Sequence, residues 1–172
     1  MFLKKFHFKK ITSTNDKSIK LIKAGHKKGI VVADFQTKGK GRHGNKWISL
    51  NGNLHMSVFF EINKKLLLNK LIKFNLNIIK ETLQKFSKKK IKIKLPNDLT
   101  INRKKVCGIL QEIIFDDNQK FLIVGIGVNI KDSPKIDKYP TSYLNNYLTN
   151  KTNKLVVCKY IKMAYEKNNL AI

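Results

Sequence analysis

Cysteine, arginine and acidic residues are scarce in this chain of 172 residues. The two cysteines, Cys107 and Cys158, form no CxxC motif and no Cys/His cluster. Neither a disulfide framework nor a zinc site is therefore expected, and both thiols should be buried and reduced. No apolar segment has the length of a membrane span. Residues 1–10 alternate Phe and Leu with Lys and His, unlike a secretory signal, so we expect a cytoplasmic protein with no membrane partner.

Negative charge is in short supply, because 36 lysines and arginines face 11 acidic residues for a formal net charge of +25. Such a charge creates a long-range field that favours RNA, anionic lipid or an acidic partner. The excess is almost all lysine, spread along the chain, whereas a nucleic-acid interface usually concentrates arginine and aromatic residues on one face. We interpret it as compositional drift. Only Arg42 and Arg103 are arginines, so Arg42 stands out as a position that needs a planar guanidinium.

Hydrophobic residues make up 42% of the chain, which is enough for a buried core, and no linker rich in Pro, Gly or Ser divides it. We therefore expect a single domain over residues 1–172. Helices are predicted where apolar residues recur at helical spacing, over Asp16–Ala24, Leu67–Phe86 and Leu155–Lys167. The first follows a Ser-Thr-Asn cluster able to cap it and ends at Gly25.

Strands are predicted where apolar runs are short or alternate with polar residues, over Gly29–Asp34, Asn53–Ile62, Ile91–Leu95, Val106–Phe115 and Lys120–Ile130. Pro96 ends the third strand, and Asp116–Asn118 is typical of a hairpin turn between the last two. Residues 133–154 are rich in Lys, Asn, Pro and Tyr, which indicates a loop with a short helical turn. The predicted fold class is α+β, a mixed, largely antiparallel β-sheet with helices packed against it.

Two stretches far apart in the chain carry the strongest indication of a ligand site. Residues 36–44 read Gln-Thr-Lys-Gly-Lys-Gly-Arg-His-Gly; residues 94–98 read Lys-Leu-Pro-Asn-Asp and are followed by Lys-Val-Cys-Gly-Ile-Leu at 105–110. Glycine lets backbone approach an anion closely and interleaved cations neutralise its charge, so the stretches predict a site for a phosphorylated nucleotide. Neither has the spacing of a P-loop or a dinucleotide-binding motif. Taken singly, they also fit a solvated Lys/Gly turn and an ordinary Pro-Asn-Asp turn.

Both stretches, in this order, resemble the catalytic domain of the biotin protein ligases, and the resemblance runs from about Phe6 to the end of the chain. Residues 11–15 end in the family's Ser-Thr-Asn segment, and residues 36–47 resemble the family pattern Gln-x-x-Gly-Arg-Gly-Arg-x-Gly with a Trp shortly after it. Residues 94–98 resemble the family's Lys-Trp-Pro-Asn-Asp, and residues 125–129 resemble its Gly-Ile-Gly-Ile-Asn. Residues 140–144 resemble a further turn of the family more loosely. Residues 11–15 alone are also explained as a helix cap.

The resemblance implies an ATP-dependent biotin protein ligase. Such an enzyme activates biotin as biotinyl-5′-AMP and transfers it to a specific lysine of the biotin carboxyl carrier protein of acetyl-CoA carboxylase. ATP and biotin would be its substrates and Mg²⁺ its metal. The glycine-rich loop would fold over the biotinyl adenylate and shield it from water, which requires flexibility as well as cations aimed at phosphate and carboxylate.

By position, the resemblance implies catalytic roles for Lys105, Arg42 and Asp98. Gly108 fixes the register in favour of Lys105 over its neighbour Lys104, and an ammonium group there would lower the cost of joining two anions. The implied biotin-binding residues are Ser13, Thr14, Asn15, Gln36, Gly39, Lys40, Gly41, Arg42 and Lys105. The implied ATP-binding residues are Lys40, Arg42, Trp47, Asn97, Asp98, Lys105 and Asn129. Asp98 and Asn129 are the candidate Mg²⁺ ligands.

The sequence departs from the family pattern at Lys40, where arginine is usual, and at Leu95, where tryptophan is usual, which puts firm closure of the loop in question. Ser13 falls too near the start for an N-terminal DNA-binding domain, and the chain stops where the family's C-terminal β-barrel would begin. We therefore expect a catalytic domain alone, with no DNA partner, and leave a homodimer open.

Three alternatives stay open. A lipoate or octanoate ligase would share the fold, although loss of the glycine-arginine loop would be its mark. A non-enzymatic RNA-binding protein driven by charge would bind in a salt-sensitive way that does not depend on biotin or ATP. A degenerate homologue would bind biotin but transfer it poorly.

Overall fold

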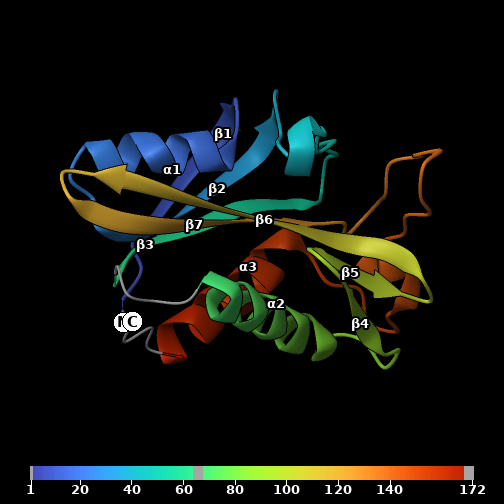
Figure 1. Cartoon of the computed structure of the whole chain (residues 1–172). Coiled ribbons are helices and arrows are strands. Elements are labelled where there is room, and N and C mark those ends of the chain that lie inside the picture. The colour runs from blue at the N-terminus through green and yellow to red at the C-terminus, as the bar shows by residue number, and fades with distance from the viewer. Residues whose placement is uncertain (1, 64–67, 169–172) are drawn as a thin grey trace.

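The computed structural model describes residues 2–63 and 68–168, which form a seven-stranded sheet with helices on both faces (Figure 1). The elements are β1 (Lys5–Ile11), α1 (Thr14–Lys23), β2 (Lys28–Gln36), the 3₁₀ turn η1 (Arg42–Gly44), β3 (Leu54–Ile62), α2 (Leu68–Gln84), β4 (Ile91–Lys94), β5 (Asp98–Ile101), β6 (Lys104–Asp116), β7 (Gln119–Val128), η2 (Leu144–Tyr147) and α3 (Lys154–Lys167). The strand order is β1-β2-β3-β7-β6-β5-β4. Only the β1–β2 pair is parallel within this sheet, so the predicted mixed, largely antiparallel sheet is confirmed.

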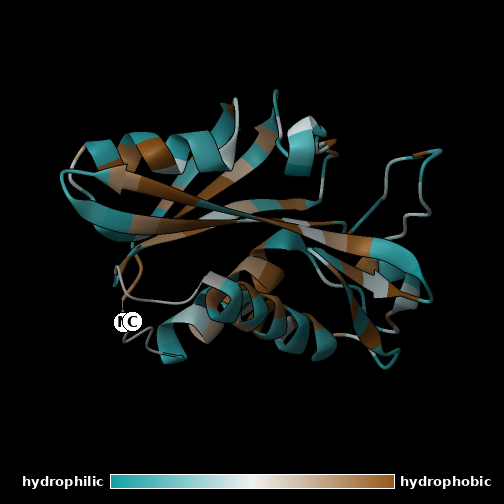
Figure 2. Cartoon of the chain, viewed as in Figure 1, coloured by the Kyte–Doolittle hydropathy of each residue, from teal (hydrophilic) through white to brown (hydrophobic). Residues whose placement is uncertain are grey.

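Helix α1 covers one face of the sheet, and α2 and α3 cover the other (Figure 1). The central strands are therefore buried on both sides. In β3, Met56 and Val58 belong to the large core shared with α2 and α3, whereas Phe59 belongs to a smaller core with Ile22 of α1. Figure 2 shows the result, with apolar stretches on the inner strands and hydrophilic residues along the outer helix faces.

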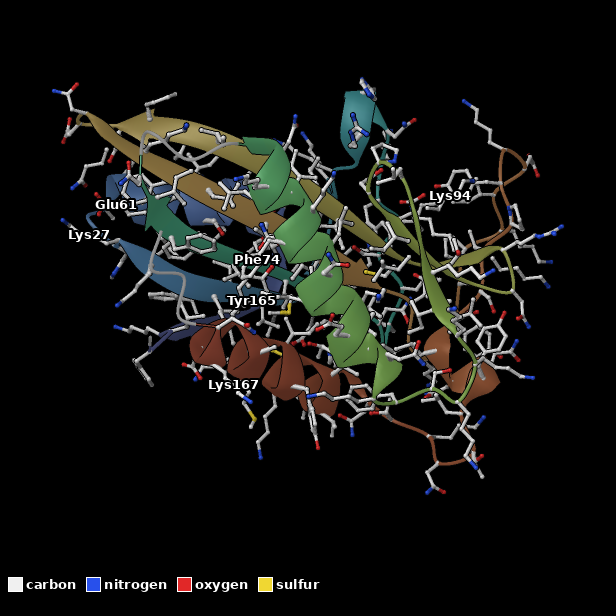
Figure 3. All side chains as sticks on the ribbon, turned by 60° about the horizontal axis from the view of Figure 1, so that its bottom comes forward. Lys27, Glu61, Phe74, Lys94, Tyr165 and Lys167 are labelled. Carbon is white, nitrogen blue, oxygen red and sulfur yellow. The ribbon has the colours of Figure 1, made fainter. Side chains whose placement is uncertain are left out.

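The large core encloses one buried polar contact that ties the two lower helices together. Tyr165 of α3 is fully buried, and its hydroxyl donates to Asn75 Oδ1 of α2 at 2.9 Å. Figure 3 shows Tyr165 and Phe74 between the ribbons of α3, α2 and the sheet. Because a buried phenol needs a partner, this bond fixes the relative position of α2 and α3 beneath the sheet.

The predicted helices and strands are confirmed within a few residues at their ends, and η2 is the short helical turn expected within residues 133–154. Leu67, where the second helix was predicted to begin, lies outside the described residues. Asp117 and Asn118 have positive φ (41° and 62°), as the tight turn between β6 and β7 requires. No helix of the described part of the chain is long and apolar enough to cross a membrane.

Two strands, β1 and β5, were not predicted. β1 is an edge strand with no fully buried side chain, so its alternation of Phe with Lys and His carries little contrast between an inner and an outer face. β5 has only four residues and follows β4 after a turn at Leu95–Asn97. Pro96 was predicted to end the strand. In the structure Lys94 pairs with Asp98, so Pro96 and Asn97 lie in the turn of a hairpin and Asp98 begins β5.

Helix α1 begins at the Ser-Thr-Asn cluster, which was interpreted both as a helix cap and as a ligand-binding segment. The start of the helix is compatible with both interpretations. Ser13 is the N-cap, with its hydroxyl accepting from the backbone N–H of Asp16 at 3.4 Å. Thr14 and Asn15 form the first turn and are buried. Because the N-cap leaves the following residues aimed at the sheet, one short segment caps the helix and contributes two polar side chains to the region described below.

Candidate active site

A pocket opens on the α1 side of the sheet, where segments distant in sequence converge. It is lined by the start of α1, the segment between β2 and β3, the β4–β5 turn, the middle of β6 and β7, and Tyr139. The predicted site residues among its lining are Ser13, Thr14, Asn15, Gln36, Lys40, Gly41, Arg42, Trp47, Asn97, Asp98 and Lys105. The structure thus brings together the two stretches that the sequence indicated. Gly39 and Asn129 do not line this pocket.

The glycine-rich segment is an ordered hairpin rather than an open loop. Trp47 N donates to Gly39 O at 2.9 Å and Gly41 N donates to Asn45 O at 2.7 Å, with Lys40 and Lys46 forming an antiparallel bridge between them. We call residues 39–47 the glycine hairpin. Its tip is the η1 turn, where left-handed conformations bring the chain back across the pocket. The sequence predicted a glycine-rich loop here, and it did not predict that the two arms of the loop pair through their backbones.

Trp47 ends the glycine hairpin, and its indole lies flat against the sheet. A Cβ added to Gly127 would come within 2.4 Å of the indole, and one added to Gly108 would come within 2.8 Å. The two glycines therefore make room for the ring on β7 and β6. Gly125 makes room for Asn15 in the same way, with a Cβ 2.4 Å from Asn15 Oδ1. In this structure, side chains of the protein lie against the Gly-Ile-Gly run of β7.

Lys105 is the only lysine of β6 in contact with the pocket carboxylate. Its Nζ lies 2.8 Å from Asp98 Oδ1, and both side chains are largely buried. The contact is an ion pair without an aligned hydrogen bond. The same ammonium lies over the rings of Trp47 (5.6 Å to the centroid) and Tyr139 (5.1 Å), where aromatic faces favour a cation. Carboxylate and rings together fix the position of the charge.

A β-bulge aims Lys105 at the pocket. The register between β5 and β6 shifts by one residue, so that Thr100 pairs with Lys105 and Leu99 with Cys107. An inserted residue changes which face the following side chains occupy, so the alkyl chain of Lys105 lies over Gly108, three residues on. Lys104, the preceding residue of the strand, is exposed and does not line the pocket. The choice of Lys105 over Lys104 is thus consistent with the structure.

A second strand edge supports the bulge. Lys105 N donates to Pro140 O at 2.9 Å and Ser142 N donates to Lys105 O at 2.8 Å. Residues 140–142, which carried the looser likeness, are therefore paired with the backbone of the principal candidate residue. This pairing holds the backbone of Lys105 from the side that β5 leaves free.

Polar side chains of α1, β2 and β3 form the opposite wall. The N–H and hydroxyl of Thr14 lie 2.8 and 3.1 Å from Gln36 Oε1, which they fix as acceptor. Ser57 Oγ lies 2.7 Å from Thr14 Oγ1 and 2.6 Å from Asn15 Oδ1. Asn15 Nδ2 in turn donates to Glu112 Oε2 at 2.5 Å. A wall of fixed amides and hydroxyls presents both donors and acceptors. The ureido ring of biotin, the substrate that the resemblance implies, requires both.

The sequence did not identify Ser57 and Glu112 as members of this wall. Ser57 lies two residues from Phe59 and therefore on the same face of β3, the face that meets α1, and this alternation was the available signal. Glu112 is in the half of β6 that faces Asn15. Its position in the sequence belongs to no motif that would have indicated a site residue. It also lines a second hollow behind the glycine hairpin, together with Phe35 and Ile48.

The remaining predicted residues have defined partners. Asn97 is tied to β6, with Nδ2 donating to Ile109 O at 3.1 Å. Asn129 is buried, donates to Ser142 O at 3.1 Å and borders a small cavity beside Lys105. Lys40 Nζ is bound to Asp16 Oδ1, which raises the pKa of the lysine, chiefly through that hydrogen bond. The Arg42 guanidinium has no hydrogen bond or ion pair within the described residues.

The pocket is strongly cationic. Among the described residues that line it, Lys40, Arg42, Lys46 and Lys105 carry positive charge, and Asp98 is the one carboxylate. Clustered cations with little countercharge favour an anionic ligand, and the free guanidinium of Arg42 suits a planar fork of carboxylate or phosphate oxygens.

The protein alone provides few ligands for a metal ion. Among the described residues, no three His, Cys, Asp or Glu side chains gather closely enough to hold one. Asp98 fits the usual arrangement for Mg²⁺, in which one or two carboxylates share the ion with phosphates of the substrate. Asn129 is already engaged by Ser142 and, at 3.4 Å, by Asn53. Cys107 is fully buried, and burial raises the pKa of its thiol, which agrees with its predicted place in the core.

The chain is similar to known proteins over most of its length. A model of the "Biotin/lipoate A/B protein ligase family" matches residues 6–129. The bifunctional ligase/repressor BirA of Bacillus subtilis is 32% identical over 148 residues, which is 80% of this chain and 45% of that protein. Biotin–protein ligase 2 of Arabidopsis thaliana is 32% identical over 126 residues, 69% of this chain and 36% of that protein. The chain thus spans less than half the length of these relatives.

Solved structures agree with the arrangement of the strands and helices. The biotin protein ligase of Leishmania major in complex with biotinyl-5-AMP is 25% identical and superposes with a TM-score of 0.81, covering 95% of this chain and 74% of that chain. The biotin protein ligase of Aquifex aeolicus in complex with biotin and ATP is 29% identical with a TM-score of 0.79, covering 97% and 70%.

Proposed function

This chain belongs to the biotin/lipoate A/B protein ligase family, and on that premise we propose that it is an ATP-dependent biotin protein ligase of the cytoplasm. It would form biotinyl-5′-AMP from biotin and ATP and pass the biotinyl group to a lysine of a biotin carboxyl carrier protein. Relatives in complex with biotinyl-5-AMP, or with biotin and ATP, support this choice of substrates.

The position of Lys105 is the observation that carries the proposal. Its ammonium lies in a cationic pocket, held by Asp98 and two aromatic rings above Gly108, which has no side chain to displace it. A carboxylate oxygen of biotin attacks the α-phosphorus, the bond to the β-phosphate oxygen breaks, and pyrophosphate leaves with the electron pair. Negative charge grows at the α-phosphoryl group in this step, and a fixed ammonium group stabilises it.

The second step transfers the acyl group. The ε-amine of the acceptor lysine attacks the biotinyl carbonyl carbon, the bond from that carbon to the phosphate oxygen breaks, AMP leaves, and the nitrogen releases a proton to solvent. No side-chain nucleophile of this chain is required, because the substrates supply both nucleophiles. The residues of this chain hold the reactants and stabilise charge.

The other side chains receive roles from their places in the pocket. We propose that Arg42 binds the carboxylate or α-phosphate, that the wall of Thr14, Asn15 and Gln36 orients the biotin ring, and that Trp47 and Asn97 border the nucleotide. Asp98 would hold Mg²⁺ jointly with substrate phosphates, and bound Mg²⁺ would neutralise phosphate charge. Ligand anions then compete with Asp98 for Lys105.

The test is to incubate the purified protein with biotin, MgATP and a biotin carrier domain, and to follow acceptor mass and pyrophosphate. We expect a mass gain of one biotinyl group that depends on ATP. Lys105→Ala should lower the rate about 100-fold or more, since removing one fixed donor to a developing charge costs roughly that much. Lys104→Ala is the matched control, because it removes a lysine from the same strand outside the pocket, and it should retain the wild-type rate.

Lipoate and octanoate are tested in parallel as competing acyl substrates, because the family includes lipoate ligases. Transfer of either in preference to biotin would replace the proposed substrate while keeping the two-step chemistry. Absence of both mass gain and pyrophosphate release with every acid would contradict the proposal altogether.

A further inference from the structure

Lys40 is bound by a carboxylate that neither the motif nor the proposed chemistry uses. Its ammonium contacts Asp16 of α1, and this contact raises the pKa of Lys40, chiefly through the hydrogen bond between the two side chains. Asp16 follows Asn15 directly and has a half-buried side chain. A second carboxylate, Glu112, adds a weaker attraction for the same ammonium. The ammonium of Lys40 is thus attracted by two carboxylates, one from α1 and one from β6.

The glycine hairpin is attached to the rest of the protein at two points. Lys40 and Lys46 pair across it, so their side chains share one face, and Trp47, the next residue, points to the opposite face. The first attachment is the Lys40–Asp16 ion pair; the second is the indole of Trp47 on the glycines of β6 and β7. Between them the hairpin crosses the pocket.

We propose that Asp16 is a positioning residue that holds the glycine hairpin across the pocket by binding Lys40. The proposal rests on the proposed function for its consequence. An acyl adenylate is a mixed anhydride that water hydrolyses, so the time it spends under the hairpin decides how much reaches the acceptor. Lys40 would then act as the closing contact, which explains how a lysine serves where a bidentate arginine is usual.

The size of the effect follows from the exposure of the pair. The side chains of Lys40 and Asp16 are 45% and 29% exposed, so the ion pair is partly screened by water. Exposed pairs shift an equilibrium by a factor of about two to five. The hairpin should therefore open often enough for substrates to enter, and loss of Asp16 should raise the open fraction by about that factor.

The first experiment needs no ligand, because Trp47 is the single tryptophan of the chain. Acrylamide quenching of its fluorescence measures how often the indole leaves the sheet. Asp16→Asn and Lys40→Gln should each raise quenching by about two- to fivefold. Asp16→Glu, which keeps the carboxylate, should retain the wild-type value. In about 1 M salt, quenching of the wild-type protein should approach that of the variants. The exchange Asp16→Lys with Lys40→Asp restores a pair and should quench less than either single change.

A matched control removes a carboxylate from another ion pair. Glu61 lies 3.8 Å from Lys27 (both labelled in Figure 3), at the ends of β3 and β2 opposite to the glycine hairpin. Glu61→Gln should leave quenching unchanged. Urea unfolding of every variant separates local opening from global loss of stability. Wild-type quenching in Asp16→Asn, or equal quenching in all variants including Glu61→Gln, would overturn the proposal.

The second experiment tests the consequence for the intermediate. Enzyme loaded with labelled biotin and MgATP is passed through a desalting column, and release of labelled adenylate is followed. Asp16→Asn should release it about two- to fivefold faster with little change in the rate of its formation. Unchanged release would limit Asp16 to the unliganded state and contradict the proposed role. If wild type forms no adenylate, the proposed function fails, whereas the quenching experiment still decides whether Asp16 holds the hairpin.

Discussion

Lys105 depends on a residue without a side chain. A Cβ at position 108 would lie 3.2 Å from Lys105 Cε and Nζ and 2.8 Å from the indole of Trp47. Contacts this short force one of the neighbours to move, and both belong to the pocket. The identity of residue 108 therefore decides where the charge of Lys105 and the ring of Trp47 can lie at the same time.

His55 provides a pH-dependent contribution to stability. It is buried in β3, and burial lowers its pKa to about 4, against the raising influence of the nearby carbonyls of Ala33 and Asp34, to which no aligned hydrogen bond forms. Its pKa in the unfolded chain is about 6.5, so between pH 6.5 and 4 the unfolded chain binds the extra proton. The contribution is complete above pH 6.5 and declines as pH falls, by at most about 1.4 kcal/mol per pH unit.

Urea unfolding at pH 7, 6 and 5 checks this expectation. His55→Gln, which keeps the size and removes the titration, should flatten the decline in the free energy of unfolding across this range. His43→Gln is the control, because His43 is exposed on the glycine hairpin, and its profile should match wild type. A profile of His55→Gln as steep as wild type would show that another group titrates.

At the residue scale, the sequence suggested candidate residues where chemistry limits the choice, and it missed residues that only the folding of the chain brings together. Lys105 was preferred to Lys104 because Gly108 sets the register, and the structure supplies the reason in the bulge. Ser57 and Glu112 were missed, because a serine or glutamate in a strand is common and only the fold brings them to Asn15. The partner of Lys40 was likewise set by tertiary contact.

At the scale of elements, long segments with a clear period were predictable and short ones were not. α2 and β3 carry an unbroken apolar pattern, and their positions follow from it. β5 and the glycine hairpin are held by pairing with neighbours rather than by their own sequence, since four residues or a glycine-rich segment hold little preference for a strand. These two unpredicted pieces line part of the pocket, together with α1, β6 and β7, which were predicted.

Helix α3 should depend on its cap. Asn153 accepts from the backbone N–H groups of Leu155 and Val156 at 2.9 and 3.1 Å, and the helix covers the large core with Ile161 and Tyr165. Asn153→Ala should lower the free energy of unfolding by about 1 kcal/mol, since those N–H groups lose their partner. Chemical unfolding measures the change. Asn153→Asp should keep most of the stability, and an equal loss in both variants would contradict the cap.

At the scale of the molecule, the net charge of +25 should act on the encounter with an acceptor rather than on the chemistry. Electrostatic steering by exposed lysines weakens as the screening length falls from about 10 Å at 0.1 M salt to about 3 Å at 1 M. Transfer to an acidic carrier domain at limiting acceptor should slow over this range by about tenfold or more.

Two controls locate the salt effect. Pyrophosphate release without acceptor should change much less, because the pocket charges are fixed at short range, and a carrier domain with neutralised acidic residues should lose most of the salt dependence. Equal slowing of both half-reactions would place the effect in the pocket. Tight RNA binding that abolishes transfer would instead favour the charge-driven alternative.

The sheet order has a consequence for how the protein folds. β6 and β7 are neighbours in sequence joined by a tight turn, whereas β7 pairs on its other edge with β3, from a distant part of the chain. Closing the long loop between β3 and β7 is the slower event, so the β6–β7 hairpin is expected to form ahead of the full sheet. Trp47 and Asn15 rest on β7, and Lys105 depends on β5 and residues 140–142. A partly folded chain therefore has no pocket, and any ligand that binds there stabilises the finished fold alone.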